Sequence, residues 1–491
     1  MKKQLFVLFI CTMVVSCSKF VETRTPDSLF DGSKVFDNDN SAIAVVNSIL
    51  ADLGRTSSIV QGWRGVSVVS GLLSDELNTV SRHADYQEIN RNAVLPNNPI
   101  IDNIWVGFYA NLYKANTVLE GAVISTTLSE KIKKQIIGES KFLRAFMNFY
   151  LVNLYGPVPL ILSTNYEQNR SSTRASVAQV YNQIIQDLKD AEDLLTSEFV
   201  NHTGAIVTQR YRPNKHAVQA LLARTYLYRG DWANAEAAAT SVISQTDRYG
   251  LETNLDNIYR QAASREVIWN FAPAVSSAGV TAVYSGEGGH YSPAILKLQG
   301  VPPQSTTYEI STYLNDGIVN AFESGDKRMT DWLESVTAGG KTYYFPFKYK
   351  TGLFVSSTVQ EYTVILRLAE VYLIRAEARA RQGNANGAKQ DVDVVRTRAG
   401  LAGTTAVTDA HMMAAIEQER RVELFTEWGH RWFDLKRWPG RNTPGISRAE
   451  EIMSVVTPLK RGVWNKNWLL LPIPATDIVN NPNLEQNPGY N

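Results

Sequence analysis

The chain has 491 residues, with 49 Lys and Arg against 48 Asp and Glu and a formal net charge of +1. This length permits a sizeable core, in one large domain or a few smaller ones. The balanced charge argues against a nucleic-acid-binding protein, which would need a basic surface. Aromatic residues make up 10% of the chain, and such rings serve sugar or peptide binding as well as core packing.

The first residues have the pattern of a bacterial secretory signal. Two lysines precede an apolar run from Leu5 to Val15, which is too short to span a membrane as a helix. The run ends in VVSC, which resembles a lipobox and predicts a signal peptide over 1–16 with a lipid on Cys17. An ordinary secreted protein is the alternative. It would leave Cys17 as an unpaired thiol, since Cys11 is the only other cysteine and is removed with the signal.

Residues 17–30 are polar and lack periodicity, which predicts a tether. The stretch DNSAIAVVNSIL (39–50) then has apolar residues on one helical face. The acidic and amide run at 37–40 lacks the glycine and distal glutamate of an EF-hand, so a helix N-cap is favoured over a calcium site. Further helices are predicted over 126–155 and 176–197.

Two helical segments far apart in the chain follow the same pattern. Ala220, Ala223 and Leu227 precede Gly230 by the same offsets at which Leu373, Ala376 and Ala380 precede Gly383. Small residues on one face, a glycine turn and a second helix are typical of tetratricopeptide repeats. Residues 250–360 are instead rich in Gly, Ser, Thr and Tyr, which predicts loops and short strands.

The segment ERRVELFTEWGHRWFDLKRW (419–438) is the most highly charged motif of the chain. Glu419, Glu423 and Glu427 recur every four residues, so they are expected on one helical face. A glycosidase needs two carboxylates at a cleft, whereas arginines beside the acids favour structural ion pairs. The ion-pair interpretation is preferred, with Arg420, Arg431 and Asp434 as the other members. The six histidines lack zinc-site spacing and no GxSxG elbow is present, so neither a metal site nor an enzyme is expected.

Two segments outside the repeats combine flat rings with hydrogen-bonding side chains, which is the mixture that sugar recognition needs. The first offers Arg82, His83, Tyr86, Gln87 and Asn90, and the second offers Tyr284, Tyr291, Tyr313 and Trp332. Each of these residues has the alternative of an ordinary loop or core role. Trp105 is expected to pack in a helix.

Several motifs together resemble the SusD/RagB family of outer-membrane nutrient-binding lipoproteins. They are SDELN (74–78), IWVGFYANLYKANTVLE (104–120), ESKFLRAFMNFYLVNLYGPVPL (139–160), ILRLAEVYLIRAEARARQGN (365–384), the 419–438 motif and LPIPATDIVNNPNLEQNPGY (471–490). The resemblance implies a mainly α fold, with four tetratricopeptide-like helix pairs and an irregular, loop-rich ligand-binding part with few short strands. One domain over 31–491 is expected, with repeat helices mainly in 39–250 and 362–437 and a loop-rich insertion around 250–360.

The resemblance also implies a function without catalysis or cofactor. Such a protein is anchored in the outer membrane by lipid, faces the cell surface, and passes captured oligosaccharide to a SusC-like TonB-dependent transporter. Two alternatives stay open. One is a RagB-like oligopeptide binder, and the other is a tetratricopeptide scaffold for surface lipoproteins without a ligand of its own.

Overall fold

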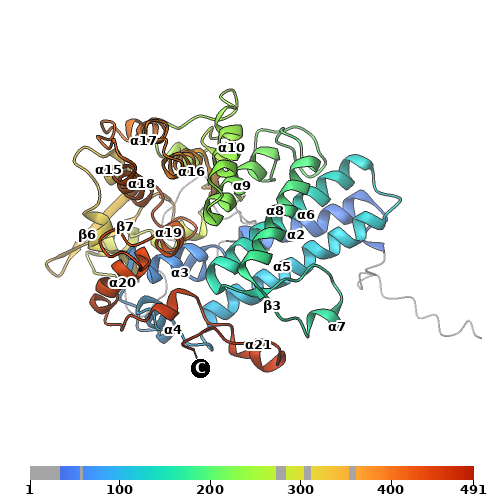
Figure 1. Cartoon of the computed structure of the whole chain (residues 1–491), viewed down its shortest axis with the longest axis horizontal. Coiled ribbons are helices and arrows are strands. Elements are labelled where there is room, and N and C mark those ends of the chain that lie inside the picture. Colours follow the sequence, from blue (N-terminus) through green and yellow to red (C-terminus); the bar gives the residue numbers. More distant parts are fainter. Residues whose placement is uncertain (1–33, 56–58, 272–283, 304–310, 353–360, 491) are drawn as a thin grey trace, which may run out of the picture.

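The computed structural model describes residues 34–55, 59–271, 284–303, 311–352 and 361–490 (Figure 1). The predicted signal peptide, the 17–30 tether and Cys17 lie outside these ranges. Helices dominate the described chain, as predicted. In these ranges no helix is both long enough and apolar enough to cross a membrane.

The first helices begin at capping residues that the sequence pattern had indicated. The long helices are α2 (Asp39–Gly54), α5 (Pro99–Ile124), α6 (Glu130–Tyr155) and α8 (Val177–Leu194). The Asn38 side chain accepts a hydrogen bond from the backbone of Ser41 at 3.1 Å, which confirms the N-cap interpretation of 37–40. Ser176 forms a capping box at the start of α8. Helix α6 begins at Glu130 rather than at 126, because Ser129 is the extended N-cap residue.

The two predicted repeats are helix pairs that lie against each other although they are far apart in the chain (Figure 1). They are α9 (Lys215–Arg229) with α10 (Trp232–Ile243), and α16 (Leu368–Arg381) with α17 (Ala385–Arg398). Gly230 ends α9 in the left-handed conformation. Arg379 of α16 pairs with Glu236 of α10 at 2.8 Å. The buried alanines allow this close packing, since their side chains leave room for the neighbouring helix.

Successive contacts join the helices into one layered stack. Helix α2 packs on α5, α5 on α6, α6 on α8, α8 on α9, and α10 on α16. The stack continues through α17 to α18 (Asp409–Glu423). The core contains Phe146, whose ring meets those of Trp269 and Trp428 edge-on. Trp105 is buried against Tyr109 and Tyr155, as expected for a packing residue.

The strands form small two-stranded antiparallel sheets rather than one large sheet. The pairs are β1 (Leu77–Thr79) with β5 (Thr312–Leu314), β2 (Val158–Pro159) with β3 (Arg174–Ala175), β4 (Val267–Phe271) with β8 (Thr363–Arg367), and β6 (Leu333–Ala338) with β7 (Lys341–Pro346). The 250–360 region holds several of these strands, as predicted. It also holds short helices: α11 (Asn257–Arg260), α12 (Gly286–Tyr291), α13 (Ala294–Gln299), α14 (Asp316–Val319) and α15 (Lys327–Trp332).

Shorter elements complete the fold around the β1–β5 pair and the C-terminus (Figure 1). These elements are η2 (Gly62–Arg64), α3 (Val66–Leu73), α4 (Ala84–Asn90), α7 (Tyr166–Asn169), α19 (His430–Arg437), α20 (Arg448–Leu459), η3 (Lys466–Leu469) and α21 (Ala475–Asn480). Helix α3 is buried along its whole length. It packs against η2, α4, α19 and β1, and so connects the early segments to the later ones.

Candidate functional site

The two predicted ligand segments lie side by side because β1 pairs with β5. Asn78 stands opposite Tyr313 in this ladder, and the backbone of Val80 donates to the Ser311 carbonyl at 2.9 Å. His290 of α12 contacts the hydroxyl of Thr312 through Nε2 at 2.8 Å. The structure thus joins residues near 80, 290 and 313 at one place, away from the α9–α10 and α16–α17 repeats.

A cluster of three side chains lies where β5 contacts strand β7 of the β6–β7 hairpin. It consists of Tyr313, Tyr343 and Lys341, and we call it the tyrosine cluster. The two rings are half-buried and meet edge-on, with centroids 5.2 Å apart. The Lys341 ammonium lies 5.3 Å from the Tyr313 ring centre and 5.0 Å from that of Tyr343. Burial raises the pKa of Tyr313, although Lys341 acts in the opposite direction; the charge of Asp316 adds to the rise.

The tyrosine cluster combines the groups that a sugar or a peptide requires. Its rings offer apolar faces, while Lys341 can donate hydrogen bonds and Asp316 can accept them. Both charged residues are exposed. The cluster rests on Leu296, Val336 and Phe345, so its rings are held in position by a small core of their own.

The first ligand segment is only partly accessible. Arg82 is exposed, His83 is half-buried, and Gln87 is half-buried with its amide donating to the Ser81 carbonyl. Asn90 is buried at the end of α4. Tyr86 is fully buried, and its hydroxyl donates to the Trp63 carbonyl. Tyr86 and Asn90 therefore pack beneath the surface residues, because neither side chain has a face that is accessible to a ligand.

The second segment divides in the same way. Tyr284 and Tyr313 are half-buried, whereas Tyr291 and Trp332 are buried. Trp332 packs against Tyr259 and Phe425 and lies near the charged groups of Lys348 and Arg398. The expectation that Tyr291 and Trp332 present a binding platform therefore does not fit this structure, since surrounding side chains cover both rings.

Sequence reasoning missed three accessible residues near these segments. Lys341 and Tyr343 belong to the β6–β7 hairpin, and Trp63 is half-buried with the Arg64 guanidinium 3.9 Å from its ring centre. The Gly339-Gly340 pair before KTYYFPF was an available hairpin signal. Nothing local distinguishes Trp63 from a core tryptophan.

Buried acids in the neighbourhood are mostly neutral or paired. Glu287 in α12 is buried, and its Oε2 atom has no hydrogen-bond partner. Burial raises the pKa of Glu287 to about 8 and lowers that of His290 to about 3, so both are uncharged at neutral pH. In the described part of the chain, no group of three or more His, Cys, Asp or Glu side chains is arranged to hold a metal ion.

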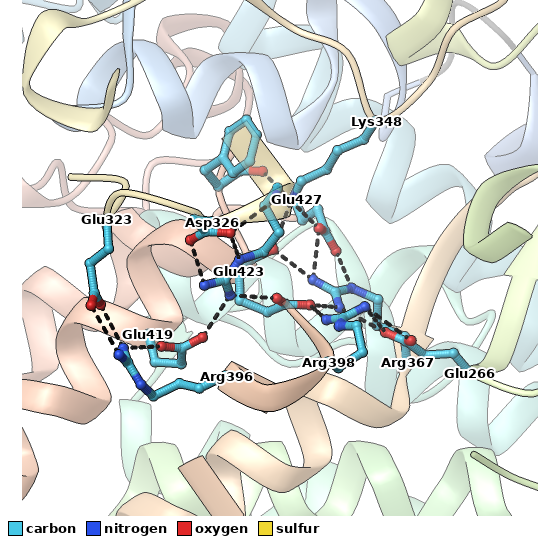
Figure 2. A network of polar contacts seen from close by, with 12 residues as sticks. Glu266, Glu323, Asp326, Lys348, Arg367, Arg396, Arg398, Glu419, Glu423 and Glu427 are labelled. Carbon is cyan, nitrogen blue, oxygen red and sulfur yellow. Dashed lines mark hydrogen bonds and ion pairs between the residues drawn. The ribbon is translucent and has the colours of Figure 1, made fainter. Parts of the chain in front are cut away.

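Residues of the charged 419–438 motif form buried ion pairs, and Figure 2 shows those of Glu419, Glu423 and Glu427. Glu423 accepts from Arg328 at 2.8 Å and from Arg367 at 2.5 Å, and it also pairs with Arg398. Arg420 pairs with Asp434 at 2.6 Å, and Arg431 pairs with Asp75 at 2.7 Å and with Glu417 at 3.2 Å. Glu419 pairs with Arg328 and Arg396, and Glu427 pairs with Arg367 and Lys348. Each of the six residues of the predicted ion-pair motif is thus in an ion pair.

One detail of the prediction for this motif is wrong. Helix α18 ends at Glu423, so Glu427 lies in the following turn rather than on the same helical face. Thr426 and Trp428 adopt positive φ angles of 52° and 48°, which breaks the helix before α19. The turn nevertheless brings Glu427 to Arg367, at 2.8 Å, and to Lys348 (Figure 2).

The surrounding cations hold two of these carboxylates ionised. Burial by itself would raise the pKa of Glu423, but Arg398, Arg367 and Arg328 lower it far below its usual value. Arg367 and Lys348 likewise lower the pKa of Glu427 against the effect of burial. Burial raises the pKa of Glu419, but Arg328 and Arg396 bind its enclosed carboxylate. This arrangement suits structural support rather than acid catalysis at a cleft.

Two family models match the chain. One, described as the SusD family, matches residues 304–490, and the other, described as starch-binding and associating with the outer membrane, matches residues 39–227. Together they cover more than half of the chain.

Individual proteins are similar to the chain over most of its length. "SusD-like protein P25" of Formosa agariphila is 23% identical and is matched over 99% of this chain and 97% of its own. "Starch-binding protein SusD" of Bacteroides thetaiotaomicron is 26% identical over 76% of this chain and 74% of its own. The second of these relatives is named as a starch-binding protein.

Solved structures share the fold. A SusD homologue from Bacteroides thetaiotaomicron superimposes with a TM-score of 0.76 at 19% identity, covering 93% of this chain and 98% of that one. A structure described as a laminarin-binding SusD-like protein gives a TM-score of 0.72 at 23% identity, covering 92% of this chain and 99% of that one.

Proposed function

Because the chain belongs to the SusD family, we propose that it is a lipid-anchored outer-membrane protein that binds a glycan and delivers it to a SusC-like TonB-dependent transporter. The observation that carries the binding part is the tyrosine cluster, where paired rings lie beside Lys341 and Asp316. The relatives named as starch-binding and laminarin-binding support a glycan as the ligand.

The apolar surface of the α9–α10 and α16–α17 pairs supports a binding protein over a scaffold on these two repeats. A tetratricopeptide scaffold would need an apolar patch on its repeats for partner proteins. Among the exposed large apolar side chains of the described residues, Val394 is the one that lies in α9, α10, α16 or α17, and it is 40% exposed. A single such side chain is ordinary for a monomer surface.

The proposal includes no catalytic step. Glu423 and Glu427 have lowered pKa values and are bound by arginines, so neither is suited to donate a proton.

The RagB-like alternative, an oligopeptide ligand, is favoured by one feature only: the charges of Lys341 and Asp316 would suit the two termini of a peptide.

Calorimetry of the protein without its lipid tests the ligand class. The panel contains maltohexaose, laminarihexaose, an oligogalacturonate and mixed-sequence hexapeptides. We expect binding of at least one oligosaccharide and of no peptide. Binding of peptides alone would replace the glycan by the RagB-like alternative, and silence across the panel would favour the scaffold.

Protease shaving of intact cells tests the location. The wild-type protein should be cleaved on the cell surface, and a Cys17→Ser variant, which cannot be acylated, should no longer be retained in the membrane. A wild-type protein that resists shaving in intact cells but not in lysed cells would contradict the surface location.

A further inference from the structure

A hollow lies at the opposite end of the molecule from the tyrosine cluster. It has a volume of about 440 Å³ and is formed by the C-terminal half of α5, residues 36–37, the turn after α5 and Thr164. In Figure 1 the C-terminal end of α5, which lines it, is far from β6 and β7. This volume falls in the range of small-molecule sites in proteins.

The walls of this hollow, which we call the α5 pocket, are fixed by specific contacts. Phe36 lies so close to α5 that a Cβ atom at Gly121 would approach its ring to 2.1 Å. The hydroxyls of Ser125 and Thr127 donate to the Phe36 carbonyl at 2.7 and 3.2 Å. On the other side, Thr164 is held by Glu120, with its backbone N–H at 2.9 Å from the carboxylate. The pocket is therefore already formed before any ligand binds.

Exposed residues of the α5 pocket lining offer a ring and polar groups that bind no other described residue. Tyr113 is 53% exposed. In the described chain, the Tyr113 hydroxyl, the Asp37 carboxylate and the Thr126 hydroxyl take part in no hydrogen bond. A flat ring beside a carboxylate and hydroxyls is the combination that binds the apolar face and the hydroxyl groups of a sugar.

The charge of the lining restricts the class of ligand. Asp37 and Glu120 are the ionisable acids of the lining, and no Lys, Arg or His contributes to it. A uronate or sulfate group would be repelled by these two carboxylates. The ammonium of Lys133, which is outside the lining, donates to the Ser125 carbonyl at 2.7 Å. We propose that the α5 pocket is a second carbohydrate site that takes a neutral hexose unit of a glycan. This inference rests on the proposed glycan-binding function and specifies where, and for which sugars, a second contact is made.

Two separated sites on one molecule have a physical consequence. A long glycan can bind the tyrosine cluster and the α5 pocket at the same time. Once one site is occupied, the rest of the same glycan reaches the other site at a raised effective concentration. A hexasaccharide is too short to span both ends of the molecule, so it reports each site separately. Helix α5 alone, with 26 residues, is about 39 Å long.

The test counts binding sites by calorimetry with maltohexaose and laminarihexaose. The wild-type protein should bind two molecules of at least one of them. Tyr113→Ala should weaken one of the two sites about tenfold, because the stacking surface is lost. Tyr166→Ala removes a tyrosine that is 71% exposed and lies outside the pocket, so it should leave both sites unchanged. Oligogalacturonate should show no binding that depends on Tyr113.

A combined variant separates this inference from the proposed function. In a Tyr313→Ala/Tyr343→Ala protein, one molecule of neutral hexasaccharide should still bind, and addition of Tyr113→Ala should abolish it. If the double variant binds nothing while the wild type binds one molecule, the second site is overturned and the proposed function stands. If a basic peptide, and no glycan, binds in a Tyr113-dependent way, both the ligand class of the pocket and the glycan function are overturned.

Discussion

Glu423 is the residue on which most of the buried charge network converges. It pairs with Arg328, Arg367 and Arg398, all nearly inaccessible to solvent (Figure 2). Removal of one partner from a buried ion network leaves the others uncompensated in a medium of low dielectric constant. The network therefore holds α15 and β8 against the later helices α17 and α18.

We expect Glu423→Gln to lower the free energy of unfolding by about 3–5 kcal/mol. Chemical denaturation measures this value. Glu167→Gln is the matched control, since Glu167 has 72% of its side chain exposed and pairs only with Arg170 in the described chain. That variant should change stability by less than about 0.5 kcal/mol. Similar small losses in both variants would contradict a structural role for the network.

Glu287 makes the free energy of unfolding depend on pH. The dependence has the opposite sign from that of a carboxylate in an ion pair. Burial raises the pKa of Glu287 in the folded protein to about 8, against about 4.3 in the unfolded chain. Between these values the unfolded chain releases the proton and the folded protein keeps it. The contribution of Glu287 to stability therefore falls as pH rises across this window, by up to about 1.4 kcal/mol per pH unit.

Glu287→Gln stays neutral at every pH and should flatten this dependence. Chemical denaturation at pH 5 and at pH 8 measures the free energy of unfolding of both proteins. The variant should be more stable than wild type at pH 8, and the difference should be small at pH 5. Equal differences at both pH values would mean that Glu287 is not protonated in the folded protein.

At the scale of elements, the packing of the repeat helices depends on small side chains. Ala239 of α10 is fully buried, whereas Ala237 of the same helix is exposed. Ala239→Leu should cost about 1–3 kcal/mol because the neighbouring helix leaves no room. Ala237→Leu carries the same change in helix propensity and should be nearly neutral. Thermal unfolding of both variants compares them, and equal melting temperatures would contradict close packing at Ala239.

Helices with local signals were predictable from the sequence, and contacts between distant segments were not. Asn38 and Ser176 mark helix starts by their chemistry, and Gly230 and Gly383 mark the repeat turns. By contrast, nothing local in SDELN indicates that β1 pairs with β5, more than two hundred residues later in the chain. The side-by-side placement of the two ligand segments therefore required the structure.

Within the candidate site, residue type indicated which side chains suit a ligand but did not indicate their exposure. Trp332 and Tyr313 have similar surroundings in the sequence, yet Trp332 is buried at the end of a short helix and Tyr313 is half-buried on β5. Glu427 was misplaced on α18 because positive φ angles at Thr426 and Trp428 have no glycine to signal them. Lys341 and Tyr343 were missed although a Gly-Gly turn precedes them.

In the whole molecule, the helical stack and the loop-rich part have separate roles. The repeats are held by alanine packing and by ion pairs such as Arg224 with Glu370, at 2.6 Å. The tyrosine cluster lies on its own small core and is accessible. Substitutions in the cluster should therefore change ligand binding without a change in the stability of the stack.

Affinity electrophoresis on gels that contain soluble starch or laminarin tests whether the tyrosine cluster is the main glycan-binding site. Wild-type protein should be retarded by at least one of these glycans, and Tyr313→Ala/Tyr343→Ala should lose most of that retardation at an unchanged melting temperature. Tyr166→Ala should migrate like wild type. Equal retardation of the double variant and the wild type would contradict the tyrosine cluster as the main glycan-binding site.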